Sequence, residues 1–323
     1  MPSRPAKKSA RRTLSELPPS DDAPTRPYAA PDPPSAPAVG SGGRGHRGEV
    51  VVEGLRWRPF GRREPVLDGI DLAIPAGQRL LLAGPSGSGK STLLRALGGL
   101  LEVADAGEGS GTVTIDGAEA GSRPGAVGLV LQEPGAGVVA ATIGRDVAFG
   151  PENVGLPRHA MPARVRTAVD TVRLGKPLDT PTGALSGGQT QRLAIAGALA
   201  LEPTVLLLDE PTAMLDAENA AAVRATVEQV ADRHHLTTVV VEHLLGPWVD
   251  FADRLLVLDA DGRIAADGAP RAVLAEYGGT LAEQGIWVPG VLEREGRPGL
   301  PTEQGLPALD PHVLRRNDDG GGL

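Results

Sequence analysis

A short glycine-rich loop carries the clearest chemical signal in the sequence. It follows an apolar run at residues 80–83 and consists of nine residues: Gly84, Pro85, Ser86, Gly87, Ser88, Gly89, Lys90, Ser91 and Thr92. They fit the pattern G-x-x-x-x-G-K-[ST], in which small residues let successive backbone N–H groups surround a phosphate at the start of a helix. Lys90 would contact the β- and γ-phosphates of a nucleotide, and the Ser91 hydroxyl would ligate Mg²⁺.

A chance glycine-rich turn is the alternative, because the chain contains 44 glycines. The choice of residue at position 90 argues against it. The chain uses 28 arginines and only four lysines, yet a lysine stands where a compact ammonium suits phosphates better than a planar guanidinium does. The composition of the loop therefore favours a phosphate-binding site.

Two carboxylates follow a second apolar run, at residues 205–208. Open α/β sheets bind ligands beyond the carboxyl ends of their strands, which is where Asp209 and Glu210 stand. Asp209 is suited to hold Mg²⁺ through its water shell, and Glu210 is suited to accept a proton from an attacking water. Two acids after a strand are ordinarily a polar turn or a helix cap, but a phosphate loop upstream favours the catalytic interpretation.

A third motif, at residues 185–189, lies between these two and completes a recognisable order. It reads Leu-Ser-Gly-Gly-Gln, and its serine precedes Asp209 by 23 positions. With the phosphate loop and the Leu-Leu-Leu-Asp-Glu-Pro run, it resembles the signature of ABC ATPases. The resemblance implies that these residues contact the γ-phosphate held by an opposite subunit: Ser186, Gly187, Gly188 and Gln189. A plain Ser-Gly-Gly helix cap describes the local structure but does not explain the order of the three motifs.

The same resemblance assigns roles to further residues. Gln132 matches the glutamine that senses Mg²⁺ and water and links to a membrane partner. Asp216 matches the aspartate of the D-loop, and His243 matches the switch histidine that contacts the γ-phosphate. The aromatic ring that usually stacks on adenine aligns with Pro59, so Phe60 or Trp57 must substitute, and both could instead be core or surface residues.

A narrower resemblance covers the residues between Gln132 and Pro157. The runs Ala-Thr-Ile at 141–143 and Phe-Gly-Pro-Glu-Asn at 149–153 look like those of energy-coupling factor and cobalt-type importer ATPases, although a helix start with Pro151 in its first turn also fits. The resemblance implies a second ABC cassette, a transmembrane coupling subunit, a substrate-capturing membrane subunit and a place on the cytoplasmic face of the membrane. Five apolar residues suit a docking groove: Val138, Val139, Ala140, Ala141 and Ile143.

Composition narrows the function classes. The formal charge is −8, with the first 48 residues at +4 and the remainder therefore at −12, so we expect no nucleic-acid partner. Cysteine is absent, which excludes disulfides and thiolate chemistry. The aliphatic runs have the length of strands and fall short of the roughly 20 residues that span a bilayer. No apolar run near the N-terminus resembles a secretory signal.

The pattern along the chain predicts an α/β fold. We expect a P-loop core with an antiparallel β subdomain on its N-terminal side and a helical subdomain at about 133–187, the whole domain covering residues 49–280. Buried parallel strands are expected at 205–208, 238–241 and 255–258 because these runs are continuously apolar. The tail at residues 1–48 is rich in Pro, Ala and Gly and is expected to be disordered. The extension at 281–323 is rich in Pro, Gly and charged residues and is expected to be largely unstructured.

The sequence thus predicts an ATP- and Mg²⁺-dependent hydrolase that energises a vitamin or transition-metal importer. The alternatives are an ABC importer ATPase of another subfamily, or a non-transport ABC ATPase acting on nucleic acid or ribosomes. A P-loop kinase is more distant, because it has no use for the Leu-Ser-Gly-Gly-Gln motif. The transported solute and the choice between a homodimer and a heterodimer stay open.

Overall fold

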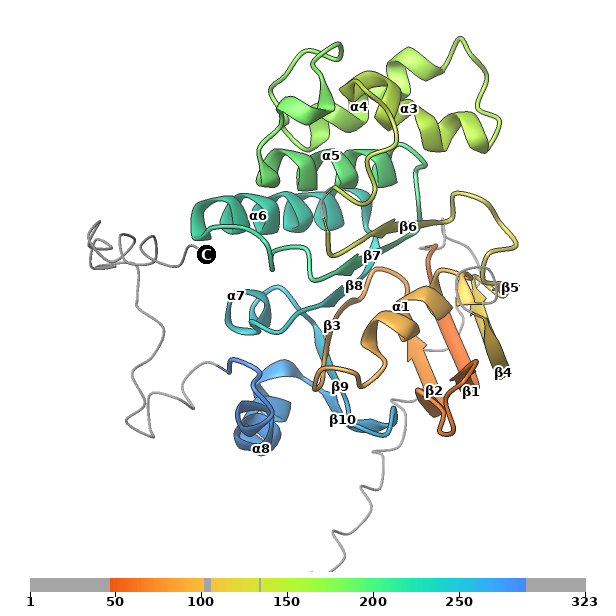
Figure 1. Ribbon diagram of the computed structural model, residues 1–323, viewed down its shortest axis with the longest axis vertical. Coiled ribbons are helices and arrows are strands. Elements are labelled where there is room, and N and C mark those ends of the chain that lie inside the picture. Colours follow the sequence, from red (N-terminus) through yellow and green to blue (C-terminus); the bar gives the residue numbers. More distant parts are fainter. Residues whose placement is uncertain (1–46, 102–105, 134, 289–323) are drawn as a thin grey trace, which may run out of the picture. The chain divides into compact units, whose positions relative to one another are not determined.

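The main sheet of the computed structural model has six strands among the described residues, which are 47–101, 106–133 and 135–288. Their order is β10-β9-β3-β8-β7-β6 (Figure 1). The bounds are β3 Arg79–Ala83, β6 Val127–Val130, β7 Val205–Asp209, β8 Thr237–Val241, β9 Arg254–Leu258 and β10 Ile264–Gly268. All pair in parallel except β10, which is antiparallel to β9. The parallel strands predicted at 205–208, 238–241 and 255–258 are confirmed, and both faces of these strands are covered.

A smaller antiparallel sheet forms the expected β subdomain, in the order β2-β1-β4-β5. Its strands are β1 Val50–Pro59, β2 Leu67–Ile74, β4 Gly107–Ile115 and β5 Ala118–Glu119. In β2 the apolar residues alternate with exposed ones, as in a strand with one buried face. This face packs with helix α1, Lys90–Leu97, against Leu80 and Leu82 of β3 and one side of the main sheet.

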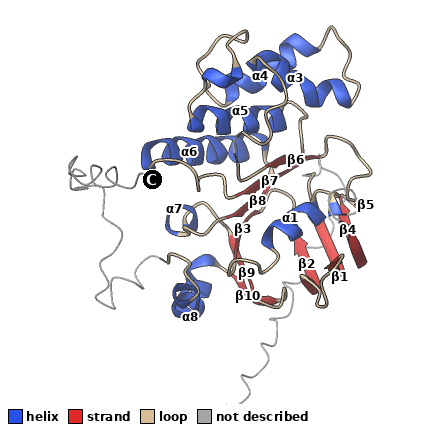
Figure 2. Ribbon diagram, viewed as in Figure 1, coloured by secondary structure: helices blue, strands red, loops and turns tan. Residues whose placement is uncertain are grey.

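The remaining helices belong to the core on the opposite side of the main sheet. They are α3 Ile143–Asn153, α4 Met161–Thr171, α5 Gly187–Leu199, α6 Ala217–His234, α7 Gly246–Val249 and α8 Pro270–Glu283. Leu81 joins this second core, whereas its neighbours Leu80 and Leu82 join the first, because successive side chains of a strand point to opposite faces. Helices α3, α4 and α5 pack on one another (Figure 2). Helices α3 and α4 lie within the helical subdomain expected at about 133–187, whereas α5 begins at Gly187, where that range ends.

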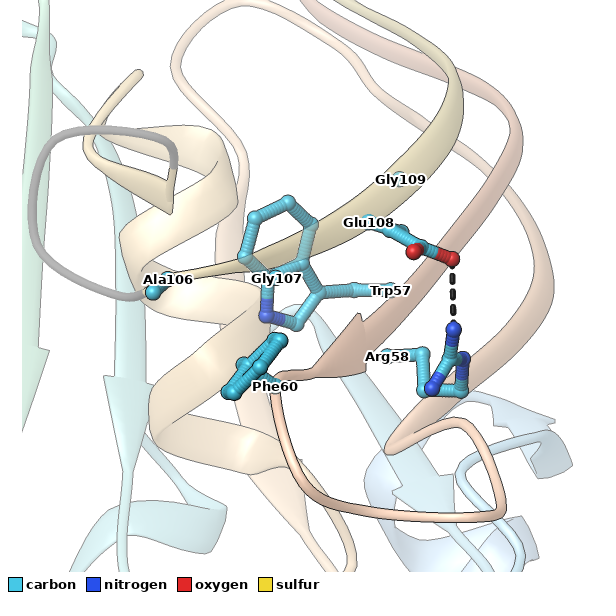
Figure 3. Close-up of a pocket in the computed structure, with 7 residues that line it drawn as sticks. All are labelled: Trp57, Arg58, Phe60, Ala106, Gly107, Glu108 and Gly109. Atoms are coloured by element: carbon cyan, nitrogen blue, oxygen red, sulfur yellow. Dashed lines mark hydrogen bonds and ion pairs between the residues drawn. The ribbon is translucent and has the colours of Figure 1, made fainter.

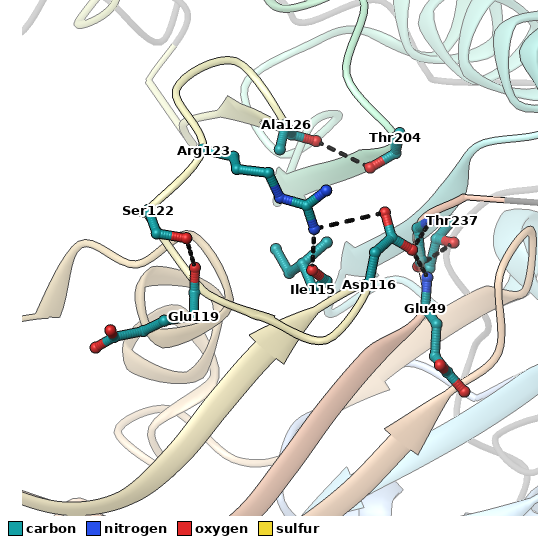
Figure 4. Close-up of polar contacts among 10 residues, drawn as sticks. Glu49, Ile115, Asp116, Glu119, Ser122, Arg123, Ala126, Thr204 and Thr237 are labelled. Atoms are coloured by element: carbon teal, nitrogen blue, oxygen red, sulfur yellow. Dashed lines mark hydrogen bonds and ion pairs between the residues drawn. The ribbon is translucent and has the colours of Figure 1, made fainter.

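Polar contacts tie the start of the small sheet to the main sheet (Figure 4). Asp116, in the turn after β4, accepts hydrogen bonds from the backbone N–H groups of Gly48 and Glu49 at 2.6 and 3.1 Å. Arg123 donates to the carbonyl of Ile115 and lies 3.9 Å from Asp116. The hydroxyl of Thr237 in β8 donates to the carbonyl of Gly48 at 2.6 Å. Gly48, the last residue of the tail predicted at 1–48, therefore belongs to the folded domain. Residues 1–46 of that tail lie outside the described residues.

The predicted boundary at residue 280 is wrong, because it falls inside α8. That helix ends at Glu283, and Ile286 and Val288 beyond it are buried in the core. Pro, Gly and charged residues become frequent only after Val288. The rest of the predicted C-terminal extension lies outside the described residues. Every helix within the described ranges is too short or too polar to span a bilayer.

Candidate functional site

The phosphate loop and the predicted catalytic residues follow four neighbouring parallel strands. The glycine-rich loop follows β3, and His243 comes two residues after the end of β8. Asp209 ends β7 and Glu210 follows it, while Gln132 comes two residues after β6. Because β3, β8, β7 and β6 are adjacent and parallel, their carboxyl ends lie along one edge of the sheet. Residues up to 159 positions apart in the chain thus meet at a single edge.

The loop geometry at 84–89 requires glycine at both ends. Gly84 has φ 145°, and a Cβ there would lie 2.5 Å from the carbonyl oxygen of Leu258. Gly89 has φ 93°, and a Cβ there would lie 2.7 Å from the carbonyl oxygen of Val66. Larger residues are excluded by strain and by contact with backbone. Helix α1 begins directly after the loop, so its N-terminal N–H groups and positive dipole end face the loop.

Lys90 is buried and folds back onto the loop that precedes it. Its Nζ donates to the carbonyl oxygens of Gly84 at 2.8 Å and Pro85 at 2.9 Å. Burial lowers the pKa of this ammonium, and the negative charges of Glu210 and Asp209 act in the opposite direction. A cation is therefore held between the loop and the two acids, where a bound phosphate would compete for it. Ser91 and Thr92 follow in the first turn of α1 and are half-buried.

Glu210 is held by residues from both neighbouring strands. The amide Nε2 of Gln132 donates to Oε2 of Glu210 at 2.8 Å. The Nε2 atom of His243 lies 3.1 Å from Oε1 of the same carboxylate. The backbone of Glu210 has φ 45°, a conformation that non-glycine residues rarely adopt and that clusters at functional sites. The three predicted catalytic residues therefore form one constellation around a single carboxylate.

Asp209 is a buried carboxylate with an oxygen that a bound cation could pair with. The residue is buried, and its Oδ1 atom has no hydrogen-bond partner within the described ranges. Leaving a buried polar atom unpaired costs about 1–3 kcal/mol, and more for a charged group. The predicted ligand set of Ser91, Gln132 and Asp209 supplies hard oxygen atoms, as Mg²⁺ prefers. These residues therefore fit a Mg²⁺ that takes its other ligands from phosphate oxygens and water.

The signature residues form the start of α5. The hydroxyl of Ser186 accepts a hydrogen bond from the backbone N–H of Gln189 at 3.4 Å, and the Gln189 side chain accepts one from the Ser186 N–H at 3.0 Å. This reciprocal pair is a capping box. A Cβ on Gly188 would lie 2.5 Å from Oδ1 of Asn219 at the start of α6, so this position too requires glycine. Gly187 occupies the first turn beside it.

Asp216 makes its contacts within the start of α6. Its Oδ1 accepts from the backbone N–H of Asn219 at 2.9 Å, and its Oδ2 accepts from the Asn219 side chain at 2.7 Å. These hydrogen bonds hold the pKa of Asp216 below its usual range. Met214, two residues earlier, is exposed. Among the described residues, the side chain of Asp216 bonds to Asn219 and so caps α6. A contact with a second subunit would come in addition to this capping role.

The two aromatic candidates for adenine stacking differ sharply in exposure. Trp57 is 3% exposed, and its ring covers Gly107 and Gly109 of β4, where a Cβ would lie 2.6 and 2.7 Å away. Phe60 is 88% exposed. Both residues line a hollow of about 450 Å³ (Figure 3). It is lined by Trp57, Arg58, Phe60, Ala106, Gly107, Glu108 and Gly109. Trp57 is thus a core residue, and Phe60 is the ring available to a base.

The predicted docking segment is only partly exposed. Val139 is 56% exposed and Ala141 is also exposed. Val138 and Ala140 are half-buried, and Val138 packs against the core. Ile143 is fully buried in the core at the start of α3, so including it in a docking groove was wrong. The Ile143 side chain packs in the core beneath α3, so none of its surface is exposed to a partner.

Glu242 is a polar residue at this edge for which sequence analysis predicted no role. It is buried, and its Oε1 accepts from the Thr212 hydroxyl at 2.5 Å and the Thr212 N–H at 3.1 Å. Burial raises the pKa of Glu242 to about 7, against the hydrogen bonds from Thr212 that lower it. The sequence feature that could have revealed this residue is its position, directly after the apolar end of β8 and directly before His243. The hydrogen bonds between Glu242 and Thr212 connect the loop after β7 to the residue next to His243.

Fold and site together define a P-loop ATPase, and comparison with known proteins specifies its kind. A family model described as ABC transporter matches residues 67–213. The energy-coupling factor transporter ATP-binding protein EcfA1 of Symbiobacterium thermophilum is 40% identical over 277 residues, which are 81% of this chain and 94% of that protein. The chain belongs to the family of ABC transporter ATP-binding proteins, and its resemblance to the energy-coupling factor members is confirmed.

Solved structures agree with this assignment. The structure of cbiO1 from Clostridium perfringens, part of the ABC transporter complex cbiONQ, has 30% identity and a TM-score of 0.61, covering 70% of this chain and 90% of that one. The ATP-binding cassette MJ0796, a dimer bound to ADP and Pi after hydrolysis, has 26% identity and a TM-score of 0.59, covering 69% and 99%. The expected α/β fold and ATP-hydrolase class are confirmed.

Proposed function

We propose that this chain is the ATP-hydrolysing subunit of an energy-coupling factor importer for a vitamin or a transition-metal ion. Two cassettes would act together on the cytoplasmic face of the membrane, docked onto a transmembrane coupling subunit that works beside a substrate-capturing membrane subunit. The observation that carries the proposal is the Glu210 carboxylate held between Gln132 and His243, next to a phosphate loop. The likeness to EcfA1 and cbiO1 supports the type of importer.

In this proposal each residue at the sheet edge has one task. The loop amides and Lys90 bind the phosphates of ATP, and Phe60 covers the adenine. Ser91, Asp209 and Gln132 would hold Mg²⁺, which neutralises phosphate charge and orients the terminal phosphate. Glu210 accepts the proton of the attacking water. His243 exchanges its contact with Glu210 for one with the γ-phosphate, which frees a carboxylate oxygen to accept that proton.

A second cassette completes each site in this account. Ser186, Gly187, Gly188 and Gln189 start α5 with N–H groups that an anion can use, since helix N-termini attract phosphate. They would contact the γ-phosphate held by the opposite cassette, and Asp216 would lie at the same contact. The chain carries both halves of the site, which permits a homodimer as well as a heterodimer.

The segment after Gln132 is the proposed docking surface. Its exposed residues Val139 and Ala141 can contact an apolar partner, and its loop has a defined shape. Oδ1 of Asp146 in α3 accepts hydrogen bonds from the N–H groups of Val139 at 2.8 Å and Ala140 at 2.9 Å. The Thr182 hydroxyl donates to the carbonyl of Ala140 at 2.8 Å. This contact connects the loop to the residues that lead into the signature motif.

Recovery of the complex from detergent-solubilised membranes tests the proposal. Val139→Asp and Ala141→Glu should leave hydrolysis by the isolated cassette within a few-fold but remove association and uptake. An unpaired carboxylate at an interface should cost several kcal/mol, roughly enough to lose a micromolar partner. Ala222→Asp, on the exposed side of α6, is the matched control and should associate normally. Association that survives both substitutions would refute this docking surface, and recovery of ribosomes or DNA would refute the importer.

A further inference from the structure

Residues 286–288, a short segment after α8, run beside the loop at residues 242–245 that carries His243. The backbone N–H of Trp287 donates to the carbonyl of His243 at 3.0 Å, and the N–H of Leu245 donates to the carbonyl of Trp287 at 3.2 Å. The two stretches pair as a parallel bridge between Leu244 and Trp287. The backbone of the histidine loop is therefore bonded to residues that follow it by more than 40 positions.

Side chains fix this segment on both of its faces. Ile286 and Val288 are each about 1% exposed and join the core that includes α8. Between them, the ring of Trp287 lies against Gly246, the first residue of α7. A Cβ on Gly246 would lie 2.9 Å from Cη2 of that ring and closer still to Cζ3. Only glycine at position 246 lets the tryptophan lie this close.

The position of the segment is set by α8, which is remote in sequence from the phosphate loop. Gly285 has φ 83° and its N–H donates to the carbonyl of Ala282 at 3.1 Å, which ends the helix and turns the chain. The N–H of Ile286 then donates to the carbonyl of Leu281 at 3.0 Å. Helix α8 in turn packs on β9 and β10. The C-terminal part of the domain thereby supports the histidine loop.

We infer that residues 286–288 hold the His243 loop in its working place, and that Trp287 is a positioning residue for hydrolysis. The inference rests on the proposed function because it acts through His243. The Nε2 atom of His243 is 3.1 Å from Glu210, near the upper limit of a good hydrogen bond. In the proposed mechanism His243 must exchange this contact for one with the γ-phosphate, so a displacement of its loop by about 1 Å would misplace the histidine for that step, and misplacements of this size can cost about 10²-fold in rate.

The inference predicts an effect on turnover more than on ATP binding. The segment bonds to the loop after β8, whereas the phosphate loop belongs to β3 and α1. Disturbing Trp287 should therefore lower kcat while KM for ATP changes by less than about threefold. A residue that only stabilised the fold would lower the melting temperature without this separation of kcat from KM.

Reciprocal substitutions in the full chain test the inference. Gly246→Ala should lower kcat by roughly tenfold to 10²-fold because its methyl group meets the Trp287 ring. Trp287→Ala should lower kcat several-fold, Trp287→Phe less, and the double variant G246A/W287A should recover part of the loss of G246A because the obstructing ring is gone. The matched control is Gly279→Ala, in α8, where a Cβ meets nothing within 4 Å and kcat should not change.

The outcomes separate the inference from the proposed function. His243→Ala serves as the reference: if it hydrolyses ATP at the wild-type rate, the role assigned to His243 fails, whatever Trp287 does. If H243A is inactive while G246A and W287A both keep wild-type kcat, the inference about Trp287 is wrong. Should G246A not fold, W287A alone decides, through kcat together with hydrogen exchange at the Leu245 amide, which should speed up. Unchanged exchange and kcat in W287A would overturn the inference.

Discussion

At the scale of single residues, Glu210 shows how the site is built. Its two oxygens contact partners from the two neighbouring strands, and its own backbone adopts an unusual conformation after β7. Such a carboxylate has little freedom to rotate, so a water placed against it meets a base of fixed direction. The nearby Asp209 differs in environment, because it is buried and one of its oxygens lacks a partner among the described residues.

Lys90 provides the first test at this scale. Lys90→Ala should abolish productive ATP binding, because the loop loses the cation that faces the phosphates. The fold should persist, since the loop backbone is unchanged and the freed carbonyls of Gly84 and Pro85 can bond to water. Binding of a fluorescent ATP analogue measures the effect, and Lys176→Ala, at an exposed position, is the control. Wild-type hydrolysis by K90A with Mg²⁺ would refute the phosphate-loop assignment.

Glu242 provides a pH-dependent test. Its pKa is about 7 in the folded protein, against an ordinary value of 4.5. Between these values the folded state binds more protons than the unfolded state, so the free energy of unfolding falls as pH rises through that window. The difference of about 2.5 pH units corresponds to roughly 3 kcal/mol. Wild-type protein should therefore lose stability from pH 5 to 8 relative to Glu242→Gln, which stays neutral and can still accept from Thr212.

Urea unfolding at several pH values measures this difference. Other groups titrate equally in both proteins, so the comparison isolates Glu242. Parallel curves for wild type and E242Q across pH 5–8 would show that Glu242 is not buried as a neutral acid.

At the scale of elements, the buried parallel strands could be predicted from the sequence, but their order in the sheet could not. The runs at 205–208, 238–241 and 255–258 are apolar without interruption, and the structure has them as β7, β8 and β9. Strand β4 begins at Gly107, because its polar and glycine residues gain strand structure only by pairing with β1. Such pairing is a tertiary effect that a local pattern does not carry.

The site was predictable to the extent that it depends on motifs. The phosphate loop and the residues named by the motifs after β6, β7 and β8 do converge on one sheet edge, whereas the signature residues start α5 and Asp216 starts α6. What the motifs could not supply were contacts between segments distant in the chain, such as Trp287 against Gly246, Thr212 with Glu242 and the burial of Trp57 over two glycines. Each depends on packing, and a single residue type at one position does not reveal its neighbour.

Asp146 offers a test at the element scale. Asp146→Ala would leave the N–H groups of Val139 and Ala140 without their acceptor, so the docking loop should lose its shape. Each of the two lost hydrogen bonds should lower the free energy of unfolding by about 1 kcal/mol or more. We expect weaker association with the membrane complex and a modest fall in melting temperature. Asp146→Asn keeps an acceptor oxygen and should restore most of the association; equal loss in both variants would argue against the loop-shaping role.

At the scale of the whole molecule, one cassette carries both the phosphate-loop half and the signature half of an ATP site. In the proposed mechanism neither half hydrolyses ATP without the other half from a second cassette. The signature residues start α5, while the phosphate loop follows β3. ATP would therefore bring two cassettes together, and hydrolysis would release them. The transmembrane partner would follow this cycle through the segment after Gln132.

Glu210→Gln tests this account most directly. The amide keeps the shape of the side chain but cannot accept the proton, so hydrolysis should fall by about 10²- to 10⁴-fold while ATP binding survives. The ATP-bound dimer should then accumulate, visible as a doubling of molar mass by light scattering when ATP and Mg²⁺ are added. Wild-type turnover in E210Q, together with a molar mass that does not respond to ATP, would contradict both the catalytic base and the shared site.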